Sequence, residues 1–421
     1  MSDAAAQPAS ALVDPVFRRY LAARAVGMAG ATLTLVALPL LVYQRSGSAA
    51  LTALVTVLET APYLLLGLPA GALADRWRRR RVLVLTGCLS GAAMLSVPLA
   101  EVLGLLTTAQ LLVVAATTAT MFVFADAATF GVVPQMVGRA RVASATSTLV
   151  SVGTAIGVAG PLVAGVAVTL TSPALVLGVD AAASLVSAAV LARLRWPGSE
   201  ERQGSRGATR RLRSEVAEGL RFVWRHRVVR WLTVLGVGNS LAGGAAAGLL
   251  VVVGVEQLGL DADSPALGWL FAAGALGTFL GSLLLPRLQR HLGVGLITTA
   301  GYATAGGCLL LLAGAGSVAH ALPVLLLMNL AMTTLIVNGI VTRQVVTPDR
   351  LQSRVGTTAR LIAWGGAPLG AALGGVLAET AGTAWALRVA AACVLTSLVG
   401  AGVVGLWRFP RLAELSRPQP G

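Results

Sequence analysis

Three carboxyl groups stand in stretches of sequence that otherwise carry no charge. Glu59 lies in "VLETAPYLLLG", Asp126 in "MFVFADAATFG" and Asp180 in "LGVDAAAS". An ionised carboxylate in an apolar membrane setting costs roughly 2.5–3.5 kcal/mol on insertion scales, and taking up a proton removes that charge. Each group must therefore meet a cation, accept hydrogen bonds, or exchange a proton with water.

Two interpretations of these acids remain open from the sequence. Asp126 could pair with Arg24 or Arg360, and any of the three acids could hydrogen-bond to a threonine of a neighbouring helix. A carboxyl group that meets water on one side of a membrane and then on the other could instead couple proton entry to solute exit. Under this second interpretation Glu59, Asp126 and Asp180 are the candidates for proton coupling.

The composition indicates that most of the surface faces lipid. Of 421 residues, 56% are hydrophobic and only 12% are charged, with a mean hydropathy of +0.80. A soluble domain carries about 25% charged residues. The net charge of +15 does not indicate a nucleic-acid partner, because the arginines stand between apolar runs without interleaved aromatic residues.

Twelve apolar runs are long enough to cross a bilayer core about 30 Å thick as helices. We therefore predict an all-α membrane protein with twelve transmembrane helices in two pseudo-symmetric six-helix bundles. The predicted spans are 20–43, 51–74, 82–104, 109–133, 143–170, 173–194, 228–254, 265–286, 293–315, 320–342, 355–378 and 384–407.

The arginines predict the orientation of the chain. All 32 basic residues are Arg. With a cytoplasmic N-terminus, 28 of them fall in cytoplasmic segments, three lie within the predicted spans, and only Arg45 falls in an external segment. Positive residues favour the cytoplasmic side of a membrane. We therefore expect a multi-pass protein of the cytoplasmic (inner) cell membrane with both termini in the cytoplasm.

A polar stretch divides the chain into two halves. We predict an N-terminal bundle over 1–195, a cytoplasmic linker over 196–227 and a C-terminal bundle with a short tail over 228–421. An apolar residue recurs every fourth position at the end of the linker, which predicts an amphipathic helix at the membrane interface or a solvated connector. The two halves also resemble each other, and internal repeats are typical of transporters. The apolar positions of this helix are Leu212, Val216, Leu220 and Trp224.

The segment "GALADRWRRRR" (71–81) resembles the cytoplasmic signature of the major facilitator superfamily. The matching residues are Gly71, Asp75, Arg76, Arg79 and Arg80, while the usual second glycine is replaced by arginine. Further stretches, such as "EGLRFVWRHRVVRWL", are similar to the drug:proton antiporter branch that contains macrolide-efflux and enterobactin-exporter proteins.

The resemblance implies a conformational latch at this signature. Asp75 would accept hydrogen bonds from the N-terminus of the eleventh span, near Gly356, and hold the two halves together on the cytoplasmic side. The neighbouring arginines would bind carboxylates or lipid phosphates. Alternatively, the basic cluster only sets the topology.

A second motif, "GVAGPLVAG", partly matches the antiporter motif of the fifth span. Gly160, Pro161 and Gly165 match, whereas Ile156 stands where a glycine is expected, and the fourth span lacks the arginine of better-studied antiporters. We interpret this motif, together with Pro368 of the eleventh span, as bending points for a rocking motion.

Polar residues within the spans are candidates for contact with the solute, although helix packing or snorkelling explains several of them equally well. The substrate-cavity candidates are Arg24, Asn239, Asn338, Arg360 and Trp364.

The sequence thus predicts a secondary transporter and not an enzyme. It would export small amphipathic solutes, such as a drug, a macrolide or a siderophore, by proton antiport with alternating access. We expect a monomer in contact with membrane lipids, with no metal, cofactor or catalytic residue and with the proton gradient as driving force. The alternatives are an uptake carrier or a lipid-like solute flippase on the same fold, or a transport-inactive sensor.

Overall fold

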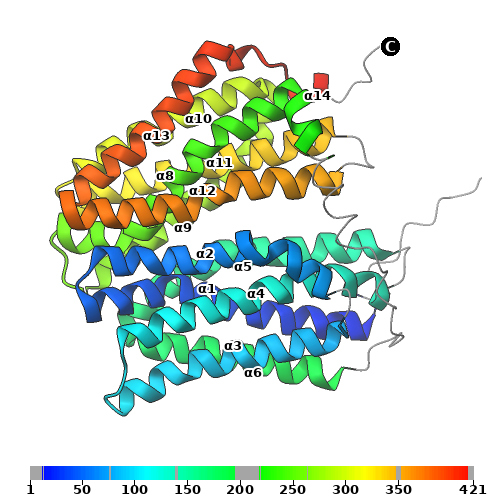
Figure 1. Cartoon of the computed structure of the whole chain (residues 1–421), viewed down its shortest axis with the longest axis vertical. Coiled ribbons are helices and arrows are strands. Elements are labelled where there is room, and N and C mark those ends of the chain that lie inside the picture. The colour runs from blue at the N-terminus through cyan, green and yellow to red at the C-terminus, as the bar shows by residue number, and fades with distance from the viewer. Residues whose placement is uncertain are drawn as a thin grey trace, which may run out of the picture. The chain divides into compact units, whose positions relative to one another are not determined.

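A computed structural model of the chain describes residues 12, 14–74, 77–137, 141–194, 218, 220–262, 264–347 and 352–415. Within these residues, twelve helices have twenty or more residues (Figure 1). They are α1 (Pro15–Ser46), α2 (Ala49–Ala74), α3 (Arg79–Val102), α4 (Thr108–Val137), α5 (Val142–Leu170), α6 (Pro173–Arg193), α8 (Arg227–Val252), α9 (Pro265–His291), α10 (Val294–Ala313), α11 (Val318–Val346), α12 (Gln352–Ala381) and α13 (Thr383–Val404). Three short helices follow α8 and α13, namely η3 (Val253–Gln257), η5 (Leu406–Arg408) and α14 (Leu412–Leu415).

The prediction of an all-helical membrane fold is confirmed. Eleven of the helices are long and apolar enough to cross a membrane, counting only residues that the structure describes. The remaining long helix, α12, has 30 residues and carries Arg354, Arg360 and Glu379. Each predicted span coincides with one helix, and most helices extend a few residues further than predicted.

Residues at the helix starts explain where several helices begin. Asp14 accepts hydrogen bonds from the backbone N–H groups of Val16 (2.8 Å) and Phe17 (3.3 Å), so α1 begins five residues before the predicted span. Ser172 caps α6 in the same way by accepting from the Leu175 N–H group, and Pro173 occupies the first helical position. These caps satisfy N–H groups that have no partner within the helix.

The contacts within the chain define two compact units. Unit 1 comprises residues 1–41 and 65–208, and unit 2 comprises residues 42–64 and 209–421. The last turn of α1 and the first sixteen residues of α2 therefore pack with the C-terminal helices. The predicted boundary at 195 lies outside the described residues and stays a prediction.

Apolar side chains occupy both the interior and the outer faces of the helices. In unit 1, Phe17 and Tyr20 are fully buried among side chains of α3, α4, α5 and α6. On the outer faces, Val163 is 58% exposed, Leu373 60% and Val399 66%. Apolar residues exposed along whole helices are expected where the surrounding medium is lipid.

Only the end of the predicted amphipathic linker helix is described. Residues 220–225 are helical, and Leu220 and Trp224 of the predicted apolar positions are exposed, at 38% and 51%. Val223 instead packs against Val229 of α8. The other two predicted positions, Leu212 and Val216, lie outside the described residues.

Candidate functional site

In unit 1, α1 and α4 bring a group of polar side chains together. Tyr20 is fully buried, lies against Thr129 of α4 and is within electrostatic range of both Arg24 of α1 and Asp126 of α4. Asp126 is half-buried. The sequence suggested Arg24 as a partner of Asp126, and the structure places both charges around the same tyrosine.

Asp180, the second acid of unit 1, is held by hydrogen bonds. Its carboxylate is 4% exposed and accepts bonds from the Thr34 hydroxyl of α1 at 2.5 Å and from the Ser184 hydroxyl of α6 at 3.3 Å. Gly30 of α1 lies so close to Asp180 that a Cβ atom there would meet the carboxylate. The Thr34 bond joins α1 to α6, whereas the Ser184 bond lies within α6. This setting agrees with the helix-packing interpretation, and proton coupling by Asp180 stays a prediction.

Glu59, in unit 2, has a different environment. It lies in the membrane-spanning part of α2, is half-buried, and makes no hydrogen bond or ion pair with any residue that the structure describes. The same helix packs tightly against α8 and α12, because Ala53 lies against Gly248 and Gly375. Of the three acids predicted from the sequence, Glu59 is the one whose carboxyl group is not engaged within the described residues.

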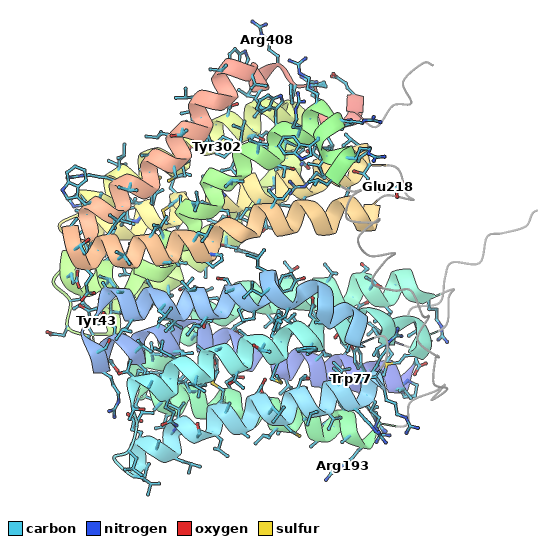
Figure 2. All side chains as sticks on the ribbon, viewed as in Figure 1. Tyr43, Trp77, Arg193, Glu218, Tyr302 and Arg408 are labelled. Atoms are coloured by element: carbon cyan, nitrogen blue, oxygen red, sulfur yellow. The ribbon has the colours of Figure 1, made fainter. Side chains whose placement is uncertain are left out.

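Two further carboxylates of unit 2 form a group that we name the carboxylate cluster, comprising Tyr43, Ser48, Glu256, Glu379 and Thr383. Glu256 of η3 accepts hydrogen bonds from the Thr383 hydroxyl of α13 at 2.7 Å and from the Tyr43 hydroxyl of α1 at 3.4 Å. Glu379 of α12 accepts from the Ser48 hydroxyl and from the Ala50 N–H group of α2, both at 3.1 Å. Figure 2 shows Tyr43 at the α1–α2 turn.

The carboxylate cluster fastens the start of α2 to the C-terminal helices. Glu379 lies at the N-terminus of α2, where a negative charge is favourable. Neither Glu256 nor Glu379 was predicted as a site residue, because both lie just beyond the predicted spans 228–254 and 355–378. A signal was available, since several acids on the side that holds few arginines must find hydrogen-bond donors elsewhere in the protein.

Glycines allow α8 and α12 to pack closely against each other next to α2, the helix that carries Glu59. A Cβ atom at Gly244 would collide with the Ala367 carbonyl, and one at Gly370 with the Leu241 carbonyl. Pro368 lies between these contacts, inside α12. The two helices therefore approach each other at backbone distance.

The antiporter-like motif of α5 also takes part in close packing. A Cβ atom at Gly160 would collide with Thr32 of α1, so this glycine is needed for the approach of α1 to α5. Pro161 lies inside α5, which continues to Leu170, and Gly165 is buried. Bending at Gly160, Pro161 and Gly165 stays a prediction.

The two asparagine candidates occupy different settings in unit 2. Asn338 of α11 is fully buried and donates to the Val294 carbonyl and the Thr298 hydroxyl, both at 3.0 Å, while accepting from Gln289 at 3.0 Å. These bonds join α9, α10 and α11. Asn239 of α8 is 6% exposed, and its side-chain oxygen has no hydrogen-bond partner in the described part of the chain.

Part of the predicted latch can be located. Arg79 and Arg80 begin α3, and Arg80 donates to the Ala192 carbonyl of α6. Gly71 lies in the last turn of α2. Asp75 and Arg76 lie outside the described residues, as do the side chains of Arg360 and Trp364.

Among the residues that the structure describes, no three histidine, cysteine, aspartate or glutamate side chains converge as a metal site requires. Cys88, Cys308 and Cys393 are unpaired thiols in three different helices.

Known proteins resemble the chain over almost its whole length. The multidrug efflux pump Tap of Mycolicibacterium fortuitum is 29% identical over 404 residues, which cover 92% of this chain and 94% of that protein. The multidrug efflux pump Tap of Mycobacterium tuberculosis (strain ATCC 25618 / H37Rv) is 29% identical over 415 residues, covering 94% of this chain and 93% of that one.

Solved transporter structures share the fold. A bacterial homologue of the human lysosomal transporter Spinster, in an inward-facing and occupied conformation, matches with a TM-score of 0.73 at 14% identity, covering 96% of this chain and 98% of its own. The nucleoside transporter NupG matches with a TM-score of 0.74 at 11% identity, covering 93% and 99%. At such identities the likeness concerns the fold alone.

The family assignment rests on a match that spans nearly the entire sequence. The model of the family described as transmembrane secretion effector matches residues 6–416. This match confirms the resemblance inferred from the signature after the second span. The chain therefore belongs to the transmembrane secretion effector family of the major facilitator superfamily, and it is a multi-pass membrane transporter rather than an enzyme.

Proposed function

We propose that this transporter exports small amphipathic drugs and that inward proton flow, carried by Glu59, drives the export. The direction and the solute class are supported by the relatives, which are named multidrug efflux pumps and align over more than nine tenths of both chains. The single observation that supports Glu59 as the proton carrier is its half-buried carboxyl group, which makes no hydrogen bond or ion pair with the described residues of its surroundings.

The physical reason is a difference in free energy between two states of α2. An ionised Glu59 without a partner must reach water, whereas a protonated Glu59 can lie among apolar side chains. Proton binding therefore favours the arrangement in which Glu59 is shielded, and proton release favours the one in which it is hydrated. A proton changes a conformational equilibrium only through such a difference between states.

The packing of α2 supports a transmission route within unit 2. Ala53, less than two turns before Glu59, lies against Gly248 of α8 and Gly375 of α12. Ser48 and Ala50, at the start of the same helix, are bonded to Glu379 of α12. A movement of α2 that hydrates or shields Glu59 must therefore strain or release these contacts.

Asp126 is the second candidate for a coupling role. Asp126 and Arg24 both lie within electrostatic range of Tyr20 in unit 1, so proton uptake by Asp126 would change the charge around this tyrosine. Asp180 is the weakest candidate, because its carboxylate already accepts one hydrogen bond from Thr34 of α1 and one from Ser184 of its own helix α6.

The proposal is tested by drug export from a bacterial host that lacks its own efflux pumps. The host expresses the wild-type chain, Glu59→Gln or the matched control Asp180→Asn, at equal membrane abundance. Resistance to erythromycin, ethidium and a catecholate siderophore is measured, together with the rate of ethidium efflux with and without a protonophore.

We expect the wild type and Asp180→Asn to raise resistance to at least one compound through protonophore-sensitive efflux. Glu59→Gln should lose at least nine tenths of the protonophore-sensitive efflux rate. Increased sensitivity of the host would indicate uptake instead of export. Full, protonophore-sensitive efflux by Glu59→Gln would exclude Glu59 as the proton carrier.

We also propose that the arginine-rich helix ends face the cytoplasm, so that the carboxylate cluster faces the cell exterior. In a background without the three native cysteines, Asp261→Cys should react with a membrane-impermeant maleimide on intact cells. Arg290→Cys should react only after the cells are opened. The opposite pattern would invert the orientation.

A further inference from the structure

The C-terminal segment of unit 2 is fixed across the start of α10. Gly405 ends α13 in the left-handed region, at φ 67°, and η5 follows directly. The Val294 N–H group of α10 donates to the Pro410 carbonyl at 3.1 Å, and a Cβ atom at Gly295 would collide with the Leu406 carbonyl. The backbone of residues 407–411 is therefore held in a fixed position against the start of α10.

Arginines at this end of unit 2 lie over aromatic rings. The guanidinium carbon of Arg227 is 5.8 Å from the ring centroid of Phe409, which joins the start of α8 to the C-terminal segment. The guanidinium carbon of Arg408 is 5.7 Å from the Trp407 ring. Both arginines are exposed, and Figure 2 shows Arg408 beyond the end of α13. A ring face orients a guanidinium group while leaving its N–H groups available to an anion.

The charge balance at this end is strongly positive. We name it the basic end of unit 2, and among the residues whose side chains the structure describes it carries nine arginines but only two acids, Glu218 and Glu414. Trp407 is 44% exposed and Trp224 51%, as tryptophans are at a membrane–water interface. The arginines of the basic end are Arg221, Arg225, Arg227, Arg230, Arg287, Arg290, Arg343, Arg408 and Arg411.

The opposite end of unit 2 has the reverse character. Glu256, Glu379 and Asp261 lie there. The guanidinium carbon of Arg388 is 5.3 Å from the centroid of the Trp385 ring. An arginine over a tryptophan therefore occurs at both ends, but a concentration of positive charge occurs at one. This contrast provides a control for the role of charge.

We propose that Arg227 and Arg408, on the basic end of unit 2, bind the headgroup phosphates of anionic phospholipids. The site lies where membrane-spanning helices end, and lipid phosphates are the anions present at that level of a bilayer. The binding fastens the C-terminal segment and the start of α8 to the membrane. It is independent of the proposed drug export and of Glu59.

The experiment measures lipid-dependent thermal stability of the purified full-length chain. The protein in detergent is titrated with phosphatidylglycerol or with zwitterionic phosphatidylcholine, and the half-saturating lipid concentration is read from the rise in Tm. The variants are Arg227→Gln/Arg408→Gln, the charge-conserving Arg227→Lys/Arg408→Lys, and the control Arg388→Gln.

We expect phosphatidylglycerol, but not phosphatidylcholine, to raise the Tm of the wild type and of Arg388→Gln. The glutamine double variant should need about tenfold to thirtyfold more phosphatidylglycerol, since each arginine near an anionic surface contributes about a factor of five. The lysine double variant should stay within a few-fold of the wild type.

Three results would overturn the proposal. They are equal stabilisation by both lipids, an equal loss in Arg388→Gln, and an unchanged titration in the glutamine double variant. If the glutamine double variant does not fold, 0.5 M NaCl added to the wild type replaces it as the test. Salt must then raise the half-saturating concentration of phosphatidylglycerol at least fivefold, and an unchanged concentration would contradict the site.

Discussion

The Glu379 carboxylate of α12 accepts a hydrogen bond from the Ser48 hydroxyl at 3.1 Å, across 331 positions of the sequence. The same oxygen accepts from the Ala50 N–H group, so Glu379 acts as a cap for α2 from another helix. A carboxylate at a helix N-terminus benefits both from hydrogen bonds and from the positive end of the helix dipole.

Glu379→Gln should weaken this cap by about 1 kcal/mol, because the amide keeps an acceptor but loses the charge. The expected result is a lower Tm of the purified protein, and Ser48→Ala should lower it less. Glu101→Gln is the control, since the Glu101 side chain makes no hydrogen bond with described residues at the end of α3. A Tm of Glu379→Gln equal to that of the control would mean that the cap contributes nothing.

Two adjacent glycines of α8 should respond oppositely to alanine. At Gly244 a Cβ atom collides with the Ala367 carbonyl of α12, whereas at Gly243 nothing lies within 4 Å. Gly244→Ala should therefore destabilise the protein by about 1–3 kcal/mol through overpacking. Gly243→Ala should be neutral or stabilise slightly, because alanine favours helix more than glycine does. Thermal unfolding of the two variants checks this, and equal Tm values would refute the close approach of α8 and α12.

Asp180 should tolerate loss of charge but not loss of polarity. Asp180→Asn keeps an oxygen for the Thr34 hydroxyl, so both folding and transport should persist. Asp180→Leu leaves that buried hydroxyl without its acceptor and crowds Gly30, and should cost about 1–3 kcal/mol. Membrane abundance and Tm are the measurements. If Asp180→Asn folds normally but abolishes proton-driven efflux, Asp180 has a coupling role after all.

Acid should loosen the start of α8 through His226. Its Nδ1 accepts from the Val229 N–H group at 3.4 Å, and burial lowers the pKa of His226 below its ordinary value. The unfolded chain then binds a proton at His226 more readily than the folded chain does. The contribution of neutral His226 to the free energy of unfolding is therefore fully present above about pH 6.5 and is lost as the pH falls through the lowered pKa. A protonated ring also loses its acceptor and places a cation at a helix N-terminus.

His226→Asn provides the comparison, because asparagine caps a helix without titrating. We expect the Tm of the wild type to fall more steeply than that of His226→Asn between pH 6.5 and pH 5. Parallel curves for the two proteins would show that His226 does not contribute to the acid sensitivity.

The positions of the helices could be predicted because each needs a long apolar run bounded by turn residues. Asp14 and Pro15 even form a recognisable helix start that the hydropathy pattern alone placed too late. The sequence does not reveal which face of a helix meets which neighbour. Glu59, Asp126 and Asp180 therefore looked alike, although Asp180 accepts hydrogen bonds from Thr34 and Ser184 whereas Glu59 makes none with the described residues.

Hydrogen bonds between residues far apart in the sequence could not be predicted. Glu256 lay two residues beyond the predicted seventh span, yet α8 continues into η3 and brings this acid to Thr383 of α13. Asn338 was a candidate for solute contact, and its bonds to α9 and α10 depend on neighbours 40 or more positions away. Such pairings follow from the packing of helices and leave no local pattern in the chain.

The most direct test of proton coupling by Glu59 uses proteoliposomes that enclose a pH-sensitive dye. A gradient of the compound exported best in the host assay is applied without an initial pH gradient, and the proton movement that accompanies its flux is recorded. The wild type should move protons against the compound, and Glu59→Gln should let the compound equilibrate with less than a tenth of that proton movement. Equal proton movement per compound in the two proteins would contradict the assignment of Glu59 as the proton carrier.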